Sequence, residues 1–299
     1  MAGIQAIRLE GLSKRFRGGV VALESIDLQV EPGAIFGFIG PNGAGKTTTI
    51  RLMLDLIRPS AGRVQLLGED PRTAGPQLRS RIGYLPGELR LDERLTGRQT
   101  LAFLCGLRDT PMPKALALAE RLGLDLDRRV GDLSRGNKQK VGIVQAFAHE
   151  PELVILDEPT SGLDPILQRD FHELLRERSR SGLTVFLSSH VLSELQEIAT
   201  DVAMIREGKL LAVRDTAEMG REAPHRVMIR FASDVPADMF AGLDGASEVQ
   251  VDGKLARLLF RGEMDSLIKA AAEVEVVEFH STEPSLEETF LQMYGAGNR

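Results

Sequence analysis

Residues 34–48 have the sequence AIFGFIGPNGAGKTT, which is the strongest indication of the fold in this chain. Its first six residues form an almost continuous apolar run, which is typical of a strand buried on both faces of a central sheet. Residues 40–47 match the pattern G-x-x-x-x-G-K-[ST], and the apolar residues from Ile50 to Ile57 predict a helix that Pro59 ends. A glycine-rich loop between a buried strand and a helix can close its backbone N–H groups around phosphate oxygens.

The loop therefore predicts a site for a nucleoside triphosphate. We expect Lys46 to reach the β- and γ-phosphates and the Thr47 hydroxyl to bind Mg²⁺. The alternative is a glycine-rich turn without a ligand, which the strand–loop–helix context disfavours. The nucleotide-binding residues that we expect here are Gly40, Asn42, Gly43, Ala44, Gly45, Lys46, Thr47 and Thr48.

A second buried strand ends in two acidic residues. Residues 153–158 have the sequence LVILDE, and an uncompensated buried charge is costly, so a cation is expected at the strand end. Asp157 suits a place in the shell of the Mg²⁺ ion, and Glu158 suits a base that orients or deprotonates water. The alternative is a pair of acids that cap a loop.

His190 follows the apolar stretch VFLSS at residues 185–189. Ligands of open α/β sheets bind at the C-terminal ends of the strands, so an imidazole there is placed to donate to a γ-phosphate. Without the other motifs, an isolated histidine is more often structural.

Two further stretches identify a family. LSRGN at residues 133–137 resembles the LSGGQ signature of nucleotide-binding subunits of ABC transporters, and EPTSGLD at residues 158–164 resembles the strand end and D-loop of the same family. His190 resembles the switch histidine of that family, and Phe16 stands where the family has an aromatic residue. The resemblance runs from about residue 4 to residue 213.

The resemblance implies roles for individual residues. Lys46, Glu158 and His190 would catalyse ATP hydrolysis, with Thr47 and Asp157 as ligands of Mg²⁺. Phe16 would stack on the adenine, although from its sequence context alone a core position is favoured. Ser134, Gly136 and Asn137 would bind the γ-phosphate of ATP held by the opposite subunit, and Asp164 would link the two sites.

Three residues depart from the family pattern. The signature has Arg135 in place of glycine and Asn137 in place of glutamine, and the charge of Arg135 can face either phosphate or solvent. Gly87 stands where the family has the Q-loop glutamine. Glu88 is either a partial substitute for that amide or simply a loop residue, and the second reading is favoured because a carboxylate beside a triphosphate is electrostatically different from an amide.

Strands that alternate with helices predict a parallel sheet. The expected fold class is therefore α/β, and the resemblance implies a P-loop NTPase core of the ABC ATPase type, with a RecA-like parallel sheet, an antiparallel β subdomain and a helical subdomain at about residues 88–150. Residues 215–299 carry a net charge of −8 against +2 for residues 1–214, so we expect an ATPase domain over 1–214 and a small acidic α+β domain over 215–299. That second domain should contain strands at 226–231, 247–251, 255–260 and 274–280, with helices at 236–241, 263–272 and 284–293, in a βαββαβ sandwich with a last helix.

Composition excludes several classes of protein. The chain has 299 residues, 42% of them apolar and 27% charged, as in ordinary globular proteins. A single cysteine excludes an internal disulfide and fits a reducing compartment. The net charge of −6 argues against a nucleic-acid partner. The NKQK sequence at 137–140 lacks the aspartate of a guanine-binding motif, which argues against a GTPase.

The expected function is that of an ATP-binding subunit that hydrolyses ATP to power a separate polytopic membrane permease. The segments at 83–104 and 282–295 resemble ATPases that serve exporters of the ABC-2 kind. The resemblance implies that a second ATP-binding subunit, identical or different, completes a dimer at the cytoplasmic face of the cell membrane. No apolar stretch of the sequence reaches the roughly 18 residues of a membrane-spanning helix. The alternative is a soluble regulatory or ribosome-associated ATPase without a permease.

Overall fold

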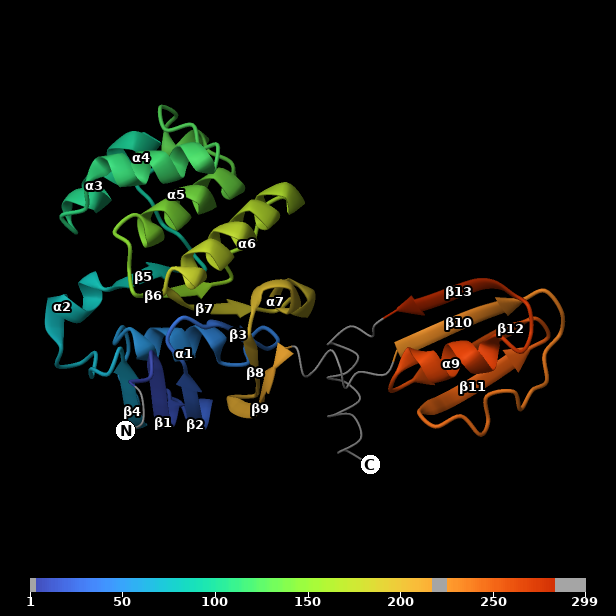
Figure 1. Ribbon diagram of the computed structural model, residues 1–299. Helices are drawn as coiled ribbons and strands as arrows, with labels where there is room; N and C mark the ends of the chain where they lie inside the picture. Colours follow the sequence, from blue (N-terminus) through green and yellow to red (C-terminus); the bar gives the residue numbers. More distant parts are fainter. Residues whose placement is uncertain (1–3, 217–224, 283–299) are drawn as a thin grey trace. The chain divides into compact units, whose positions relative to one another are not determined.

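A six-stranded sheet lies at the centre of the N-terminal part of the chain in the computed structural model, which describes residues 4–216 and 225–282 (Figure 1). Its strand order is β5-β6-β7-β3-β8-β9, and the pairs from β5 to β8 are parallel. Every residue of β3, β6 and β7 is buried, which explains the apolar sequence of these strands. The expected parallel α/β sheet is confirmed. Its strands are β3 (Ile35–Ile39), β5 (Ile82–Leu85), β6 (Leu153–Asp157), β7 (Thr184–Ser189), β8 (Asp201–Arg206) and β9 (Lys209–Asp215).

An antiparallel three-stranded sheet forms a second layer, in the order β2-β1-β4. Its strands are β1 (Ile7–Arg15), β2 (Val21–Val30) and β4 (Ala61–Leu66). Helix α1 (Lys46–Met53) lies between the two sheets, and side chains from both sheets and from α1 share one core (Figure 1). The expectation that this helix extends to Ile57 is wrong, because Leu54 is its C-cap and Asp55 has a positive φ of 56°.

Three helices form a group at the top of Figure 1, and the last of them contacts β5. They are α3 (Gly97–Gly106), α4 (Met112–Arg121) and α5 (Arg135–Phe147), and a 3-10 turn (Val130–Asp132) precedes the last of them. Thr96 and Gln99 form a capping box that fixes the start of α3. Cys105, near the end of α3, is buried, and burial raises the pKa of its thiol. Two other helices connect strands of the central sheet, namely α6 (Pro165–Arg180) and α7 (Leu192–Ile198), and α2 (Gly75–Ser80) leads from β4 of the antiparallel sheet to β5.

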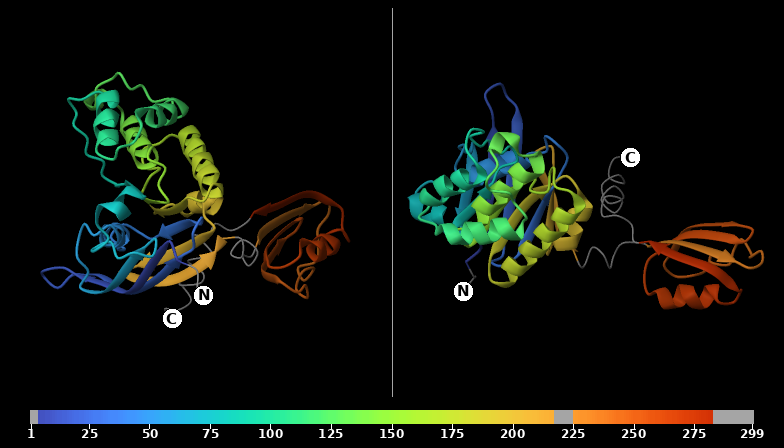
Figure 2. Two further views of the ribbon diagram at one scale, coloured as in Figure 1. Left: turned by 60° about the vertical axis from the view of Figure 1, so that its left-hand side comes forward. Right: turned by 90° about the horizontal axis from the view of Figure 1, so that it is seen from above.

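The contacts within the chain separate two compact units, Met1–Arg214 and Asp215–Arg299. The second unit has a four-stranded antiparallel sheet in the order β11-β12-β10-β13, which is the strand order of a βαββαβ unit. One helix, α9, contributes Leu267 and Ala271 to the core against one face of this sheet (Figure 2). Its elements are β10 (His225–Phe231), β11 (Ala246–Asp252), β12 (Leu255–Phe260), α9 (Met264–Ala271) and β13 (Val276–Thr282).

The helix expected at 236–241 is wrong. Backbone N–H groups of Met239, Ala241 and Leu243 each bond to the carbonyl three residues earlier, which gives successive turns rather than an α-helix. Phe240 still fills the core of the unit with none of its surface exposed, so the apolar signal reported burial and not helicity. The helix expected at 284–293 lies outside the described residues.

Among the described residues, no helix has the length and apolar character needed to cross a bilayer.

Candidate active site

The loop at residues 40–45 joins β3 to α1 at the C-terminal edge of the central sheet. Gly45 is the N-cap of α1 and has φ 115°, and a Cβ there would lie 2.7 Å from Leu23 Cδ2. A Cβ on Gly40 would lie 2.3 Å from the carbonyl oxygen of Ile205. Only glycine fits these two positions, so the close packing of β2 and β8 against the loop explains the glycines as fully as a ligand does.

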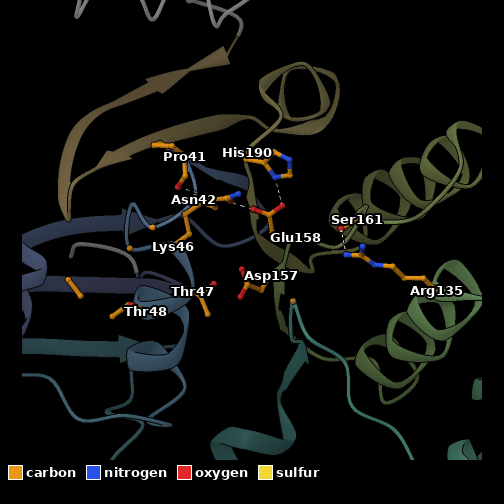
Figure 3. Close-up of a pocket in the computed structure, with 14 residues that line it drawn as sticks. Pro41, Asn42, Lys46, Thr47, Thr48, Arg135, Asp157, Glu158, Ser161 and His190 are labelled. Atoms are coloured by element: carbon orange, nitrogen blue, oxygen red, sulfur yellow. Dashed lines mark hydrogen bonds and ion pairs between the residues drawn. The ribbon is translucent and has the colours of Figure 1, made fainter. Parts of the chain in front are cut away.

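A cavity of about 410 Å³ opens beside this loop (Figure 3). Among its lining residues are the loop, the two acids at the end of β6 and the histidine after β7. The structure therefore brings together side chains that are far apart in the sequence. The residues that line it are Ala22, Pro41, Asn42, Gly43, Gly45, Lys46, Thr47, Thr48, Gly87, Arg135, Asp157, Glu158, Ser161 and His190.

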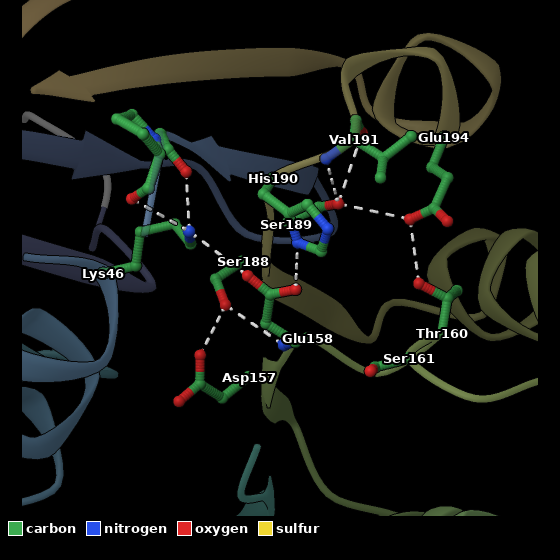
Figure 4. A network of polar contacts seen from close by, with 12 residues as sticks. Lys46, Asp157, Glu158, Thr160, Ser161, Ser188, Ser189, His190, Val191 and Glu194 are labelled. Atoms are coloured by element: carbon green, nitrogen blue, oxygen red, sulfur yellow. Dashed lines mark hydrogen bonds and ion pairs between the residues drawn. The ribbon is translucent and has the colours of Figure 1, made fainter. Parts of the chain in front are cut away.

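Lys46 is held between the loop and an acid. Its Nζ lies 2.6 Å from the carbonyl oxygen of Gly40 and 3.2 Å from Glu158 Oε1, and only 6% of its side chain is exposed. The other carboxylate oxygen, Glu158 Oε2, lies 2.5 Å from His190 Nδ1 (Figure 4). One carboxylate thus joins the two groups that are expected to contact a γ-phosphate.

Asp157 is anchored by a hydroxyl from the neighbouring strand. Ser188 Oγ donates to Asp157 Oδ1 at 2.6 Å and accepts from the backbone N–H of Glu158 at 3.1 Å. The carboxyl group of Asp157 is buried, and no lysine, arginine or histidine pairs with it in the part of the chain that the structure describes. Burial, followed by the charge of Asp157, raises the pKa of Tyr84. A buried carboxylate in this state fits a bound cation.

The backbone turns sharply directly after Asp157. Glu158 has a positive φ of 51°, which is rare for a residue with a side chain and is favoured at functional sites. This turn places Glu158 beside Lys46, while Asp157 accepts the hydrogen bond from Ser188 Oγ.

The signature residues lie at the start of α5. Ser134 is the N-cap, and its hydroxyl accepts from the backbone N–H of Asn137 at 3.3 Å. Gly136 packs closely on the D-loop, because a Cβ there would lie 2.9 Å from the carbonyl oxygen of Gly162. None of these three signature residues lines the cavity of its own chain.

The side chain of Arg135 is directed to the D-loop and the cavity. Its Nη2 donates to Ser161 Oγ at 2.7 Å, and its aliphatic part lies against Gly162. The sequence left the direction of this charge open. Sequence reasoning did not single out Ser161 or Ser188 either, although each is a polar residue next to an identified motif.

Other expected residues lie outside the cavity lining. Asp164 is the N-cap of α6, where its Oδ1 accepts from the backbone N–H groups of Ile166 and Leu167. Phe16 follows β1, is 42% exposed, and has Lys14 Nζ 5.1 Å from its ring centroid. Gly40 and Ala44 shape the loop without lining the cavity.

The position of the expected Q-loop glutamine, Gly87, has room for a side chain. A Cβ on Gly87 would lie 3.4 Å from the carboxylate of Asp157, which is an ordinary contact. The carboxylate of Glu88 is 83% exposed, pairs with Arg90 at 3.1 Å, and does not line the cavity.

Comparisons with known proteins identify the family of the chain. The family model described as ABC transporter matches residues 23–161. The bacitracin transport ATP-binding protein BcrA of Bacillus licheniformis is 33% identical over 97% of this chain and 98% of its own length. The daunorubicin resistance ATP-binding protein DrrA3 of Streptomyces coeruleorubidus is 32% identical over 98% of this chain and 97% of its own.

Solved structures show the same fold. An ATP-binding subunit of an ABC transporter, 28% identical, superimposes with a TM-score of 0.66 over 72% of this chain and 92% of its own. The dimeric bacterial ABC transporter cassette MJ0796, 21% identical, gives a TM-score of 0.65 over 70% of this chain and 98% of its own. Similarity over the whole length of two relatives, together with the fold, confirms the resemblance seen in the sequence, and the chain belongs to the ABC transporter family.

Proposed function

We propose that this chain is the ATP-binding subunit of an exporter of the ABC-2 kind, and that it hydrolyses ATP to power a separate membrane permease. The observation that carries this proposal is the convergence of Lys46, Asp157, Glu158 and His190 on one cavity beside the glycine-rich loop. These side chains supply the charges that phosphoryl transfer to water requires.

Magnesium fits the residues that are present. Thr47 and Asp157 both line the cavity and offer a hydroxyl and a carboxylate oxygen, which are the hard ligands that Mg²⁺ prefers. The buried carboxylate of Asp157, without a cationic partner among the described side chains, supports this assignment. When bound, the ion would neutralise charge on the β- and γ-phosphate oxygens.

The chain's own residues would then divide the work of hydrolysis. Lys46, which forms an ion pair with Glu158 in this structure, would turn toward the phosphates. This movement would free Glu158 Oε1 to accept a proton from the attacking water. His190 would keep Nδ1 on Glu158 and present Nε2 to the γ-phosphate.

A second subunit would complete each site. Ser134, Gly136 and Asn137 do not line the cavity of their own chain, which supports their action on ATP held by an opposite subunit. The solved cassette MJ0796 is a dimer. We propose that residues 1–214 form the ATPase domain of such a homo- or heterodimer, and that residues 215–299 form a small additional domain.

The relatives indicate the class of permease. BcrA is named for bacitracin transport and DrrA3 for daunorubicin resistance, and a third relative in Mycobacterium tuberculosis, 31% identical, is a fluoroquinolones export ATP-binding protein. We propose an exporter of comparable small compounds, with this chain bound peripherally at the cytoplasmic face of the membrane and the cargo selected by the permease.

The test has two parts. The purified full-length chain should bind and hydrolyse MgATP, and a tagged copy expressed in its native cell should co-purify with a polytopic membrane protein. Failure to bind ATP would refute the proposed site. Co-purification with ribosomes in place of a membrane protein would favour the soluble alternative.

A further inference from the structure

A second carboxylate, that of Glu194, lies close to the active site without lining its cavity. Glu194 is in the first turn of α7 and is half-buried. Its Oε2 accepts hydrogen bonds from Thr160 Oγ1 at 2.8 Å and from Ser189 Oγ at 3.2 Å (Figure 4). One oxygen atom therefore contacts two different segments, the loop after β6 and the end of β7.

Both segments carry residues of the active site. Thr160 comes two residues after Glu158, and Ser189 directly precedes His190. The side chains of Thr160 and Ser189 are buried, so each hydroxyl needs an acceptor within the protein. Glu194 supplies the acceptor for Thr160 and one of two acceptors for Ser189, the other being the carbonyl oxygen of Val191 at 3.2 Å.

Ser189 also fixes the turn that carries His190. Its Oγ accepts from the backbone N–H of Val191 at 2.9 Å, so the two residues on either side of His190 are bonded to each other. Glu194 binds the same hydroxyl and thereby ties this turn to α7. The imidazole itself is 50% exposed and has one described partner, the carboxylate of Glu158.

The loop after Glu158 is also hydrogen-bonded to α5. Gln139 Nε2 donates to the carbonyl oxygen of Pro159 at 2.9 Å, and Arg135 donates to Ser161. Thr160 lies between these two contacts and is the point at which the loop is bonded to α7. The loop is thus hydrogen-bonded to two helices, to α5 through Arg135 and Gln139 and to α7 through Glu194.

We propose that Glu194 is a positioning residue for ATP hydrolysis, which sets the distance between Glu158 and His190 by bonding Thr160 and Ser189 at once. This inference rests on the proposed function. Glu194 touches neither the cavity nor the reacting groups, so its removal should leave nucleotide binding intact. A small displacement of catalytic groups is enough to slow a reaction strongly.

The first test is kinetic. In the full-length chain, Glu194→Ala should lower kcat for MgATP by about 10- to 100-fold with KM changed by less than about 3-fold. Glu194→Gln should retain most of the activity, because its amide oxygen still accepts from both hydroxyls. Thr160→Val, which removes a hydroxyl at nearly constant shape, should also lower kcat, and the double variant should be no worse than Glu194→Ala alone.

A matched control comes from the same helix. Glu197 also lies on α7, but its carboxylate contacts His172 on α6 instead of the active-site loops. Glu197→Ala should therefore leave kcat near the wild-type value. Equal losses in Glu197→Ala and Glu194→Ala, without rescue by glutamine, would indicate general loosening of α7 and overturn the proposal.

The second test does not depend on turnover. Hydrogen exchange of the nucleotide-free protein should become faster in peptides that cover residues 158–163 and 189–191 in Glu194→Ala, but not in Glu194→Gln or Glu197→Ala. The hydrogen bonds that would open are those of Ser161 N–H to Glu158 O, Leu163 N–H to Thr160 O and Val191 N–H to Ser189 Oγ. Unchanged exchange would overturn the proposal, whereas a wild-type chain without ATPase activity would refute the proposed function and leave this measurement valid.

Discussion

Replacing Glu158 by glutamine tests whether the acid competes with ATP for Lys46. In the structure the lysine is 3.2 Å from the carboxylate, and the exposed fractions of the two side chains are 6% and 22%. A hydrogen bond to a charged group contributes about 1.5–3 kcal/mol and a neutral one about 0.5–1.5 kcal/mol. Lys46 stays charged and can still donate to the glutamine oxygen, so the substitution removes only the attraction between the two opposite charges, about 1 kcal/mol. We therefore expect Glu158→Gln to bind ATP roughly 5-fold more tightly.

Turnover should change in the opposite direction. Glutamine has no basicity, so hydrolysis should be slower by at least about 10²-fold. Titration calorimetry gives the affinity for ATP, and single-turnover phosphate release gives the rate. Glu177→Gln is a matched control, because its exposed carboxylate pairs with Arg121 on the surface at 2.5 Å and does not line the cavity.

Two results would refute this reasoning. An unchanged affinity would show that Lys46 does not have to leave Glu158 when ATP binds. Normal turnover would remove the catalytic role of Glu158. In the expected case, size-exclusion chromatography with light scattering should show an ATP-dependent dimer of Glu158→Gln, while the wild-type chain elutes mainly as a monomer.

Three other substitutions and a truncation probe the site and the fold. Lys46→Ala should abolish binding of fluorescent ATP, because the triphosphate loses its main point charge, and wild-type affinity would contradict the phosphate site. Gly87→Gln should raise the ATPase rate and lower the Mg²⁺ concentration at half-maximal activity, because a Cβ at this position would lie 3.4 Å from the Asp157 carboxylate and the site has room for the new side chain. No change would mean that the amide has no role here. A chain truncated after Asp215 keeps β9 whole and should bind ATP as tightly as the full-length protein, while a folded truncation without binding would show that later residues complete the site. Burial, and then the charge of Arg108, lowers the pKa of His149 from 6.5 to about 4. The unfolded chain therefore binds the extra proton, and the free energy of unfolding should decrease by about 1–2 kcal/mol between pH 6.5 and pH 4. His149→Gln should flatten this dependence in urea titrations, and an equal slope in both proteins would exclude His149 as its source.

The central sheet could be predicted because its strands carry their own signal. The strands that end at Ile39 and Asp157 are buried at every position, and a strand buried on both faces is recognisable in the sequence as a nearly continuous apolar run. The strand β9, by contrast, was not predicted, because its four apolar residues at 210–213 are too short a run to identify a strand by pattern alone, and none of them is fully buried. The same limit applies to the segment 236–241, where Phe240 is buried by contacts with β10 and not by a helical face.

The candidate site shows a similar division. Lys46, Asp157 and Glu158 stand in motifs whose chemistry can be recognised locally, and the structure places them around one cavity, although their roles remain predictions. The direction of Arg135 could not be predicted, since it depends on Ser161, 26 residues away. Glu194 gave no sequence signal either, because its two partners lie in the loop after β6 and at the end of β7, which only the folded sheet brings together.

Cys105 gives this protein a practical property. It is the single cysteine of the chain, it is 6% exposed on α3, and its raised thiol pKa keeps the reactive thiolate scarce at neutral pH. The natural sequence is therefore equivalent to a cysteine-free background for maleimide chemistry. A cysteine introduced at an exposed position such as Ser193 on α7 would be the one thiol that labels rapidly. A spin label there could measure the distance between two copies of the chain during an ATPase cycle, with no native residue removed beforehand.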